Sequence, residues 1–166
     1  IKDRISFFEN PKIKEWPKSK LINKTENPIF LVGFPRSGTT LLDTILRSHS
    51  SIEVIEEKPI MDEFIQSLNK KIYSNLNNLK TLDEKLLAEM RKIYFDIQSK
   101  YVGNDDKKIY IDKMPLNLIH AGEIVRIFPD AKFILAVRHP CDCVLSCFMQ
   151  NFVLNDAMAN FLDLKD

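Results

Sequence analysis

The sequence predicts an α/β domain with three layers, in which a central parallel sheet is flanked by helices. Two observations predict this fold. Short, continuous apolar runs at 29–33 and 132–137 are typical of strands that are buried on both faces of a sheet. A segment with apolar residues at helical spacing follows each run, and strands that alternate with helices form parallel sheets covered on both faces.

Length and composition agree with one globular domain. The chain has 166 residues, of which 45% are apolar and 28% are charged, and its formal net charge is +1. A net charge so close to zero does not favour a protein that coats nucleic acid or a membrane surface, so no nucleic-acid partner is expected. No basic and apolar leader and no apolar run of membrane-spanning length is present, which favours a cytoplasmic protein.

The first part of the chain differs in character from the rest. It is polar, and Pro11, Pro17 and Pro28 interrupt it. We therefore expect a short helix or two in residues 1–28, as a lead-in to a single domain at 29–166.

The segments after the first apolar run continue the alternation of helices and strands. Apolar residues at helical spacing from Leu41 to Leu46 predict a first helix, and the alternating residues 52–55 predict a second short strand. Residues 60–102 are helical in pattern. Within them, Thr81 and Glu84 have the spacing of a capping box, which predicts that a helix opens there.

The last third of the chain repeats this pattern. Three elements are predicted around the strand at 132–137: a strand at 109–112, a helix at 116–128 that ends before Pro129, and a helix from Pro140 into the 150s. The last helix carries three closely spaced cysteines, Cys141, Cys143 and Cys147. Their spacing suits neither a disulfide scaffold nor a zinc site, so we expect buried thiols.

The segment after the first strand has the chemistry of an anion-binding loop. It reads Gly33-Phe34-Pro35-Arg36-Ser37-Gly38-Thr39-Thr40 and has the spacing of the P-loop motif G-x-x-x-x-G-K-[ST]. Glycines allow such a loop to curl, so that its N–H groups and the amino end of the next helix face an anion. The predicted fold is therefore P-loop-like.

One position of the loop departs from that motif. Nucleoside triphosphatases have a lysine where this chain has Thr39, and that lysine serves the β- and γ-phosphates while the next hydroxyl holds magnesium. Here the cation is Arg36. Such a loop suits a shorter anion that needs no metal, and a 5′-phosphosulfate fits, with Arg36 near the oxygens where charge develops. A structural turn with Arg36 exposed is the alternative.

A second candidate anion site follows the strand at 132–137. Arg138 comes directly after this strand, and Ser146 lies on the next helix. An arginine fork suits a terminal phosphate dianion, and a serine hydroxyl adds a neutral donor. Alternatively, Arg138 pairs with Asp142 and Ser146 is a surface hydroxyl. Taken together, the two sites favour a nucleotide with a 3′-phosphate over ATP, which has none.

These motifs resemble those of the sulfotransferase family. Sulfotransferases carry P-[KR]-[SA]-G-[ST]-[ST] after the first strand, and a strand followed by Arg-(x)7-Ser, which Arg138 and Ser146 match. The resemblance is to tyrosylprotein sulfotransferases and to bacterial sulfotransferase-family proteins, some of them linked to tetratricopeptide repeats. It covers residues 28–60 and 109–155.

The resemblance implies a donor and the residues that bind it. The donor is PAPS (3′-phosphoadenosine 5′-phosphosulfate), and no metal is expected. Arg138 and Ser146 would hold its 3′-phosphate. The 5′-phosphosulfate would be bound by the loop residues Pro35, Arg36, Ser37, Gly38, Thr39 and Thr40.

The resemblance also implies catalytic residues. Tyrosylprotein sulfotransferases have a Glu-Glu pair at this distance past the loop, and the member that aligns with Glu57 is the base. Related bacterial sequences have a single glutamate that aligns better with Glu56, so both are candidates, with Glu57 preferred and a solvated acidic turn as the alternative. Lys113 is similar to the family lysine that stabilises the transferring group, with Arg36 beside it; a surface lysine is the alternative. The chain departs from the tyrosylprotein pattern at Lys58-Pro59, where that family has Thr-Arg.

The function that follows is transfer of a sulfuryl group from PAPS to a hydroxyl or amine, with release of PAP. A non-catalytic module that binds PAP or PAPS is the first alternative, and a P-loop nucleotide kinase is the second. His49 and His120 are further acid–base candidates, with a helix cap as the alternative for His49. The acceptor, whether a peptide tyrosine, a carbohydrate or a small molecule, and the oligomeric state are not determined by the sequence.

Overall fold

The computed structural model describes residues 2–16, 27–72, 74–103 and 109–150. Its centre is an all-parallel sheet of four strands in the order β2-β3-β1-β4. The strands are β1 (Ile29–Gly33), β2 (Ile52–Glu56), β3 (Ile109–Lys113) and β4 (Lys132–Ala136). All four predicted strands are found, and the predicted parallel sheet is confirmed.

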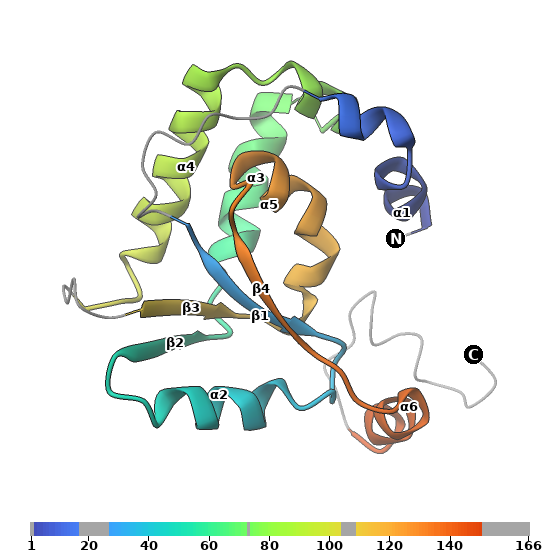
Figure 1. Cartoon of the computed structure of the whole chain (residues 1–166), viewed down its shortest axis with the longest axis vertical. Helices are drawn as coiled ribbons and strands as arrows, with labels where there is room; N and C mark the ends of the chain where they lie inside the picture. Colours follow the sequence, from blue (N-terminus) through green and yellow to red (C-terminus); the bar gives the residue numbers. More distant parts are fainter. Residues whose placement is uncertain (1, 17–26, 73, 104–108, 151–166) are drawn as a thin grey trace.

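Helices cover both faces of this sheet (Figure 1). One face is covered by α2 (Thr39–Arg47), and the other by α3 (Ile60–Ile72), α4 (Glu84–Gln98) and α5 (Ala121–Ile127). The last described helix, α6 (Pro140–Phe148), follows β4. The three-layer arrangement predicted from the sequence is therefore confirmed.

The described residues form two hydrophobic cores, one on each face of the sheet, and the side chains of each strand alternate between them. Phe30 and Val32 of β1 belong to the larger core beneath α3, α4 and α5. Leu31, between them, packs with Val54 and Ile111 in a smaller core on the α2 face. Because successive strand residues point to opposite faces, a continuous apolar run is needed where helices cover both sides.

The described part of the polar lead-in, residues 2–16, forms two short helices that pack on the domain. They are α1 (Lys2–Phe8) and the 3₁₀ helix η1 (Pro11–Glu15), as expected for a short helix or two. Phe8 and Trp16 pack against the larger core, and the Arg4 guanidinium donates to the buried Glu123 carboxylate. This segment therefore contributes to the packing of the domain.

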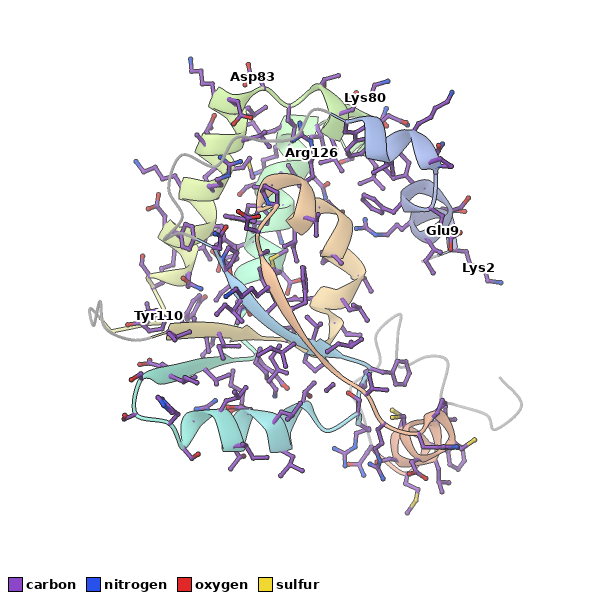
Figure 2. All side chains as sticks on the ribbon, in the orientation of Figure 1. Lys2, Glu9, Lys80, Asp83, Tyr110 and Arg126 are labelled. Atoms are coloured by element: carbon purple, nitrogen blue, oxygen red, sulfur yellow. The ribbon has the colours of Figure 1, made fainter. Side chains whose placement is uncertain are left out.

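The capping box predicted at Thr81 is wrong. Thr81 ends the 3₁₀ helix η2 (Leu76–Thr81), and α4 begins later, with Asp83 as its N-cap. The Asp83 side chain accepts from the N–H of Leu86 (2.8 Å), so the helix uses a closer carboxylate as its cap. The buried Arg126 of α5 stabilises the end of η2, because it donates to the carbonyls of Leu79 and Leu82 at 3.0 and 2.9 Å. Figure 2 labels Arg126 and Asp83.

Two predicted helices have different bounds in the structure. The segment predicted as one helix at 116–128 consists of the 3₁₀ helix η3 (Pro115–His120) followed by α5, because His120 leaves helical geometry with φ −102° and ψ 9°. The helix predicted to run into the 150s ends at Phe148; the rest of that prediction lies outside the described residues.

Two of the three cysteines of α6 are buried, and the third is exposed. Cys143 and Cys147 are buried free thiols, as predicted, whereas Cys141 is exposed because it lies in the solvent-facing first turn of the helix. Burial raises the pKa of the Cys147 thiol. Within the part of the chain that the structure describes, no helix combines the length and the apolar character needed to cross a membrane.

Candidate functional site

The loop between β1 and α2 forms a tight turn. The N–H of Ser37 donates to the carbonyl of Phe34 (3.0 Å), which closes a turn. Arg36 (φ 68°) and Gly38 (φ 102°) adopt the left-handed conformation, which glycine tolerates and arginine adopts at a cost. Gly38 is the N-cap of α2 and offers no side-chain hydrogen bond, so the first N–H groups of α2 are left for another acceptor.

The chemistry of this loop fits a bound phosphate group. A Cβ atom on Gly33 would lie 2.6 Å from the Oγ of Ser37 and 2.8 Å from the carbonyl oxygen of Ala136, so only glycine fits where the loop leaves the sheet. Ser37 is buried, and its Oγ has no hydrogen-bond partner among the described residues. A buried hydroxyl without a partner destabilises a protein by about 1–3 kcal/mol, and an anion in the loop would supply the missing acceptor.

The segment that follows β4 packs against this loop, although it lies far away in the sequence. Arg36 donates from Nε to the Oγ of Ser146 (3.0 Å), and Arg138 donates from Nη1 to the carbonyl of Arg36 (3.3 Å). The thiol of Cys147 also reaches the carbonyl of Pro35 (3.5 Å). The structure therefore brings the two predicted anion-binding motifs into direct contact.

Arg138 has a carboxylate on its other side. Its Nε lies 3.7 Å from the Oδ2 of Asp142, the pairing that one interpretation of the sequence expected. Both side chains are exposed, and such surface pairs contribute little to stability. A pocket of about 410 Å³ adjoins this arginine and is lined by Phe34, Ser37, Leu118, Leu135, Val137 and Val144, among others.

A cluster of charges lies where β2 and β3 end. Lys113 is completely buried, and its Nζ lies 2.6 Å from the Oε1 of Glu57 and 3.2 Å from the Oε1 of Glu56. Glu57 has a left-handed backbone (φ 49°), and its N–H donates to the carbonyl of Lys113 (2.8 Å). Both carboxylates are about half exposed, so they face solvent above an ammonium group that has lost its water.

The order of the strands explains why these groups share one edge. In the parallel register, Glu56 of β2 lies opposite Lys113, Lys113 lies opposite Leu31 of β1, and Gly33 lies opposite Ala136 of β4. All of these positions are at or near the carboxyl ends of their strands, where ligands bind in open parallel sheets. The polar segments that follow these strands therefore converge on one edge of the sheet.

Two residues of this charge cluster were not singled out by the sequence analysis. Arg47, in the last turn of α2, donates from Nη2 to the Oε2 of Glu56 (3.2 Å) and to the Oδ2 of the buried Asp43 (3.0 Å). The hydrogen bond to Asp43 raises the pKa of Arg47, and the charge of Glu56 adds to this effect. The sequence did contain a signal for this pair: Asp43 and Arg47 are four residues apart in a predicted helix, and side chains at that spacing share one face.

The two histidines lie in other surroundings. The Nδ1 of His49 accepts from the N–H of Ser51 (3.2 Å) in the turn before β2, and the C-cap of α2 is Ser48, so the expectation that His49 caps this helix is wrong. The Nδ1 of His120 lies 3.3 Å from the Nη2 of Arg4 and 3.8 Å from the Oε1 of Glu123. In residues 2–16, 27–72, 74–103 and 109–150, no group of three or more His, Cys, Asp or Glu side chains could hold a metal ion.

Comparisons with known proteins identify the family. The model of the sulfotransferase family matches residues 28–164. An uncharacterized protein of Aquifex aeolicus (strain VF5) is 32% identical over 149 residues, which are 85% of this chain and 19% of that protein. Protein-tyrosine sulfotransferase 1 of Danio rerio is 30% identical over 125 residues, or 71% of this chain and 34% of that protein. Human (Homo sapiens) protein-tyrosine sulfotransferase 1 is 31% identical over 115 residues, which are 66% of this chain and 30% of that protein.

A solved structure is similar at lower identity. Sulfotransferase STF9 from Mycobacterium avium matches with a TM-score of 0.43 and 16% identity, over 87% of this chain and 49% of that one. The chain spans 19–34% of the length of the three curated relatives named above. The match to the family model includes the loop after β1, the glutamate pair, Lys113 and Arg138. This chain therefore belongs to the sulfotransferase family.

Proposed function

We propose that this chain binds PAPS and belongs to an enzyme that transfers the sulfuryl group of PAPS to an acceptor hydroxyl or amine, with release of PAP. The observation that carries the proposal is the contact between two anion-binding segments, in which Arg36 donates to Ser146 and Arg138 donates to the loop backbone. A nucleotide with phosphates on the 5′ and 3′ positions of one ribose matches two adjacent anion sites. ATP would leave the second of them unused.

The chain offers suitable donors for both ends of such a nucleotide. The uncapped N–H groups at the start of α2 and the unpartnered hydroxyl of Ser37 suit the 5′-phosphate, and Thr39 and Thr40 add hydroxyls. Arg138 and Ser146 suit the 3′-phosphate, because a guanidinium fork and a hydroxyl can both donate to its oxygens. Arg138 would exchange the carboxylate of Asp142 for this phosphate.

The charged cluster supplies the groups that transfer requires. When bound, PAPS supplies the sulfuryl group: its bond from sulfur to the bridging oxygen of the 5′-phosphate breaks, the electron pair stays on that oxygen, and sulfur bonds to the acceptor atom. Glu57 takes the proton that the acceptor loses, with Glu56 as the alternative base. Lys113 and Arg36 stabilise the negative charge that develops on the bridging oxygen.

A module that binds PAP or PAPS without turnover is the second candidate function. The observation that favours it is the contact between the loop after β1 and the segment after β4, which would suffice to hold the nucleotide without the glutamate pair. Nucleotide binding with no transfer to any acceptor would identify such a module. A nucleotide kinase is disfavoured, because Thr39 stands where the phosphate-binding lysine of a P-loop would be.

Calorimetric titration with PAP, 5′-AMP and Mg-ATP tests the donor site. We expect PAP to bind more tightly than 5′-AMP, and Arg138→Ala to weaken PAP binding by about 1.5–3 kcal/mol, which is a factor of about 10 to 150. The affinity for 5′-AMP should change little in this variant. Lys132→Ala is the matched control, because Lys132 is an exposed cation at the start of β4, the strand that Arg138 follows.

The outcomes separate the candidate functions. Equal affinities for PAP and 5′-AMP would contradict the proposal, and a preference for Mg-ATP would favour a kinase. Transfer is then measured with ³⁵S-labelled PAPS and three kinds of acceptor: a peptide with tyrosine, a carbohydrate and a small phenol. Since Lys58-Pro59 follow the glutamate pair where tyrosylprotein sulfotransferases have Thr-Arg, the phenol and carbohydrate are tested beside the peptide from the start.

A further inference from the structure

A continuous row of alternating charges links α2 to the proposed catalytic cluster. Asp43 pairs with Arg47, Arg47 with Glu56, Glu56 with Lys113, and Lys113 with Glu57. The row contains three carboxylates and two cations. The carboxylates therefore outnumber the cations, and a carboxylate with a free oxygen is the one that an acceptor can approach.

Both oxygens of Glu56 are engaged in this row. Its Oε1 lies 3.2 Å from the Nζ of Lys113, and its Oε2 accepts from the Nη2 of Arg47 at 3.2 Å. A carboxylate held by a cation on each oxygen has a fixed orientation. Neither oxygen of Glu56 is therefore free to contact an acceptor.

Glu57 differs from Glu56 in the number of its partners. Its Oε1 lies 2.6 Å from the Nζ of Lys113, while its Oε2 accepts no hydrogen bond from any described residue. Its side chain is 54% exposed, so the second oxygen is open to solvent and to an approaching acceptor. The carboxylate oxygen that stays available to an acceptor thus lies at the exposed end of the row, on Glu57.

Arg47 is held in place from the helix side. It forms two hydrogen bonds with Asp43, which is only 3% exposed and lies one turn earlier in α2. This two-point contact orients the guanidinium toward the end of β2, where Glu56 lies. Without Arg47, the Glu56 carboxylate would have only Lys113 as a partner and would compete with Glu57 for it.

We propose that Arg47, anchored by Asp43, is a positioning residue that fixes Glu56 against Lys113 and so leaves Glu57 as the proton acceptor. The functional part of this inference rests on the proposed sulfuryl transfer. The geometric part, that Arg47 acts on Lys113 through Glu56, does not depend on any nucleotide. The two parts can therefore fail separately.

The test compares Arg47→Ala and Arg47→Lys with wild type. The first readout is the side-chain NH₃⁺ signal of Lys113 in ¹⁵N NMR of the chain without nucleotide. We expect this signal to shift, or to be lost through faster proton exchange, in Arg47→Ala, and Arg47→Lys to restore it in part, because an ammonium can contact one carboxylate but cannot fork between two. Lys71→Ala is the matched control: Lys71 pairs with Glu89 at 2.7 Å, with similar exposure, between α3 and α4.

The second readout is the division of the effect between binding and turnover. In Arg47→Ala we expect the affinity for PAP to stay within about twofold and kcat for transfer to 4-nitrophenol, used as the acceptor probe, to fall about 10- to 100-fold, as for other displaced catalytic groups. Glu56→Gln should show the same pattern. If 4-nitrophenol is not an acceptor, kcat is compared with the tyrosine peptide or the carbohydrate; transfer by wild type to none of the three would overturn the functional part, while the NMR comparison decides the geometric part.

Either part of the inference can be overturned. A Lys113 signal that is identical in wild type and Arg47→Ala would refute the positioning role, as would a loss of PAP affinity equal to the loss of kcat. If Lys113 responds to Arg47→Ala but wild type has no preference for PAP over 5′-AMP, the proposed function fails and the link between Arg47 and Lys113 stands.

Discussion

Replacing Asp112 by asparagine should remove a large pH dependence from the stability of this protein. Asp112 precedes Lys113 in β3, but its side chain lies on the opposite face of the sheet, completely buried against Tyr94. Burial raises the pKa of its carboxyl to about 7, although the hydrogen bond from the Tyr94 hydroxyl (3.2 Å) acts in the opposite direction. Its Oδ1 has no hydrogen-bond partner among the described residues.

The raised pKa determines the sign of the effect. The folded protein holds this proton more tightly than the unfolded chain, in which the carboxyl has its ordinary pKa of 3.8. The stabilising contribution of Asp112 is therefore fully present below pH 3.8, declines as the pH rises, and is lost above about pH 7. Since one pKa unit corresponds to about 1.4 kcal/mol, this carboxyl alone should lower the free energy of unfolding by about 2–3 kcal/mol between about pH 5 and pH 8.

Urea unfolding followed by circular dichroism measures this change. Asparagine has no charge to lose, so the stability of Asp112→Asn relative to wild type should rise by about 2–3 kcal/mol from about pH 5 to pH 8. Any constant cost of burying the amide cancels in this comparison. Asp96→Asn is the control, because Asp96 is an exposed carboxylate on α4, and its relative stability should stay flat. A flat relative stability for Asp112→Asn, within about 0.5 kcal/mol, would refute the reasoning.

Three further predictions concern the candidate site. Gly33→Ala should lower the free energy of unfolding by about 1–3 kcal/mol in urea titrations, because the added Cβ would lie 2.8 Å from the carbonyl oxygen of Ala136; an unchanged midpoint would contradict this. Asp142→Asn should tighten PAP binding several-fold in calorimetry by removing the carboxylate that competes for Arg138, and weaker binding would count against that competition. Glu57→Gln should reduce transfer from ³⁵S-labelled PAPS by at least about 100-fold and leave PAP affinity within about twofold; full activity would exclude Glu57 as the base.

Features that depend on a few neighbouring residues were predictable from the sequence. The apolar run that forms β1 and the glycines at either end of the following loop indicated a strand, a tight turn and a helix, and the structure has all three. The same holds for β4 and the segment that begins at Arg138. A strand buried on both faces must be continuously apolar, and this requirement is visible in one short stretch of chain.

Helix ends were predicted less well, because several residues compete for each cap. Thr81 had a suitable partner in Glu84, yet Asp83 lies closer to the free N–H groups of α4 and caps the helix. The break at His120 had no visible signal, since Pro115 can begin a 3₁₀ helix as readily as an α-helix.

By itself the sequence determined the class of the fold and the places where a loop or a polar segment follows a buried strand, and it predicted that the loop after β1 binds an anion. Only the tertiary structure decided which of those residues touch: that Arg36 donates to Ser146, that Lys113 is buried beneath Glu56 and Glu57, and that Arg47 reaches Glu56. The physical reason is one of range. Strand, turn and helix preferences act over a few residues, whereas contacts between distant side chains depend on strand order and register, which are set by the packing of the whole domain.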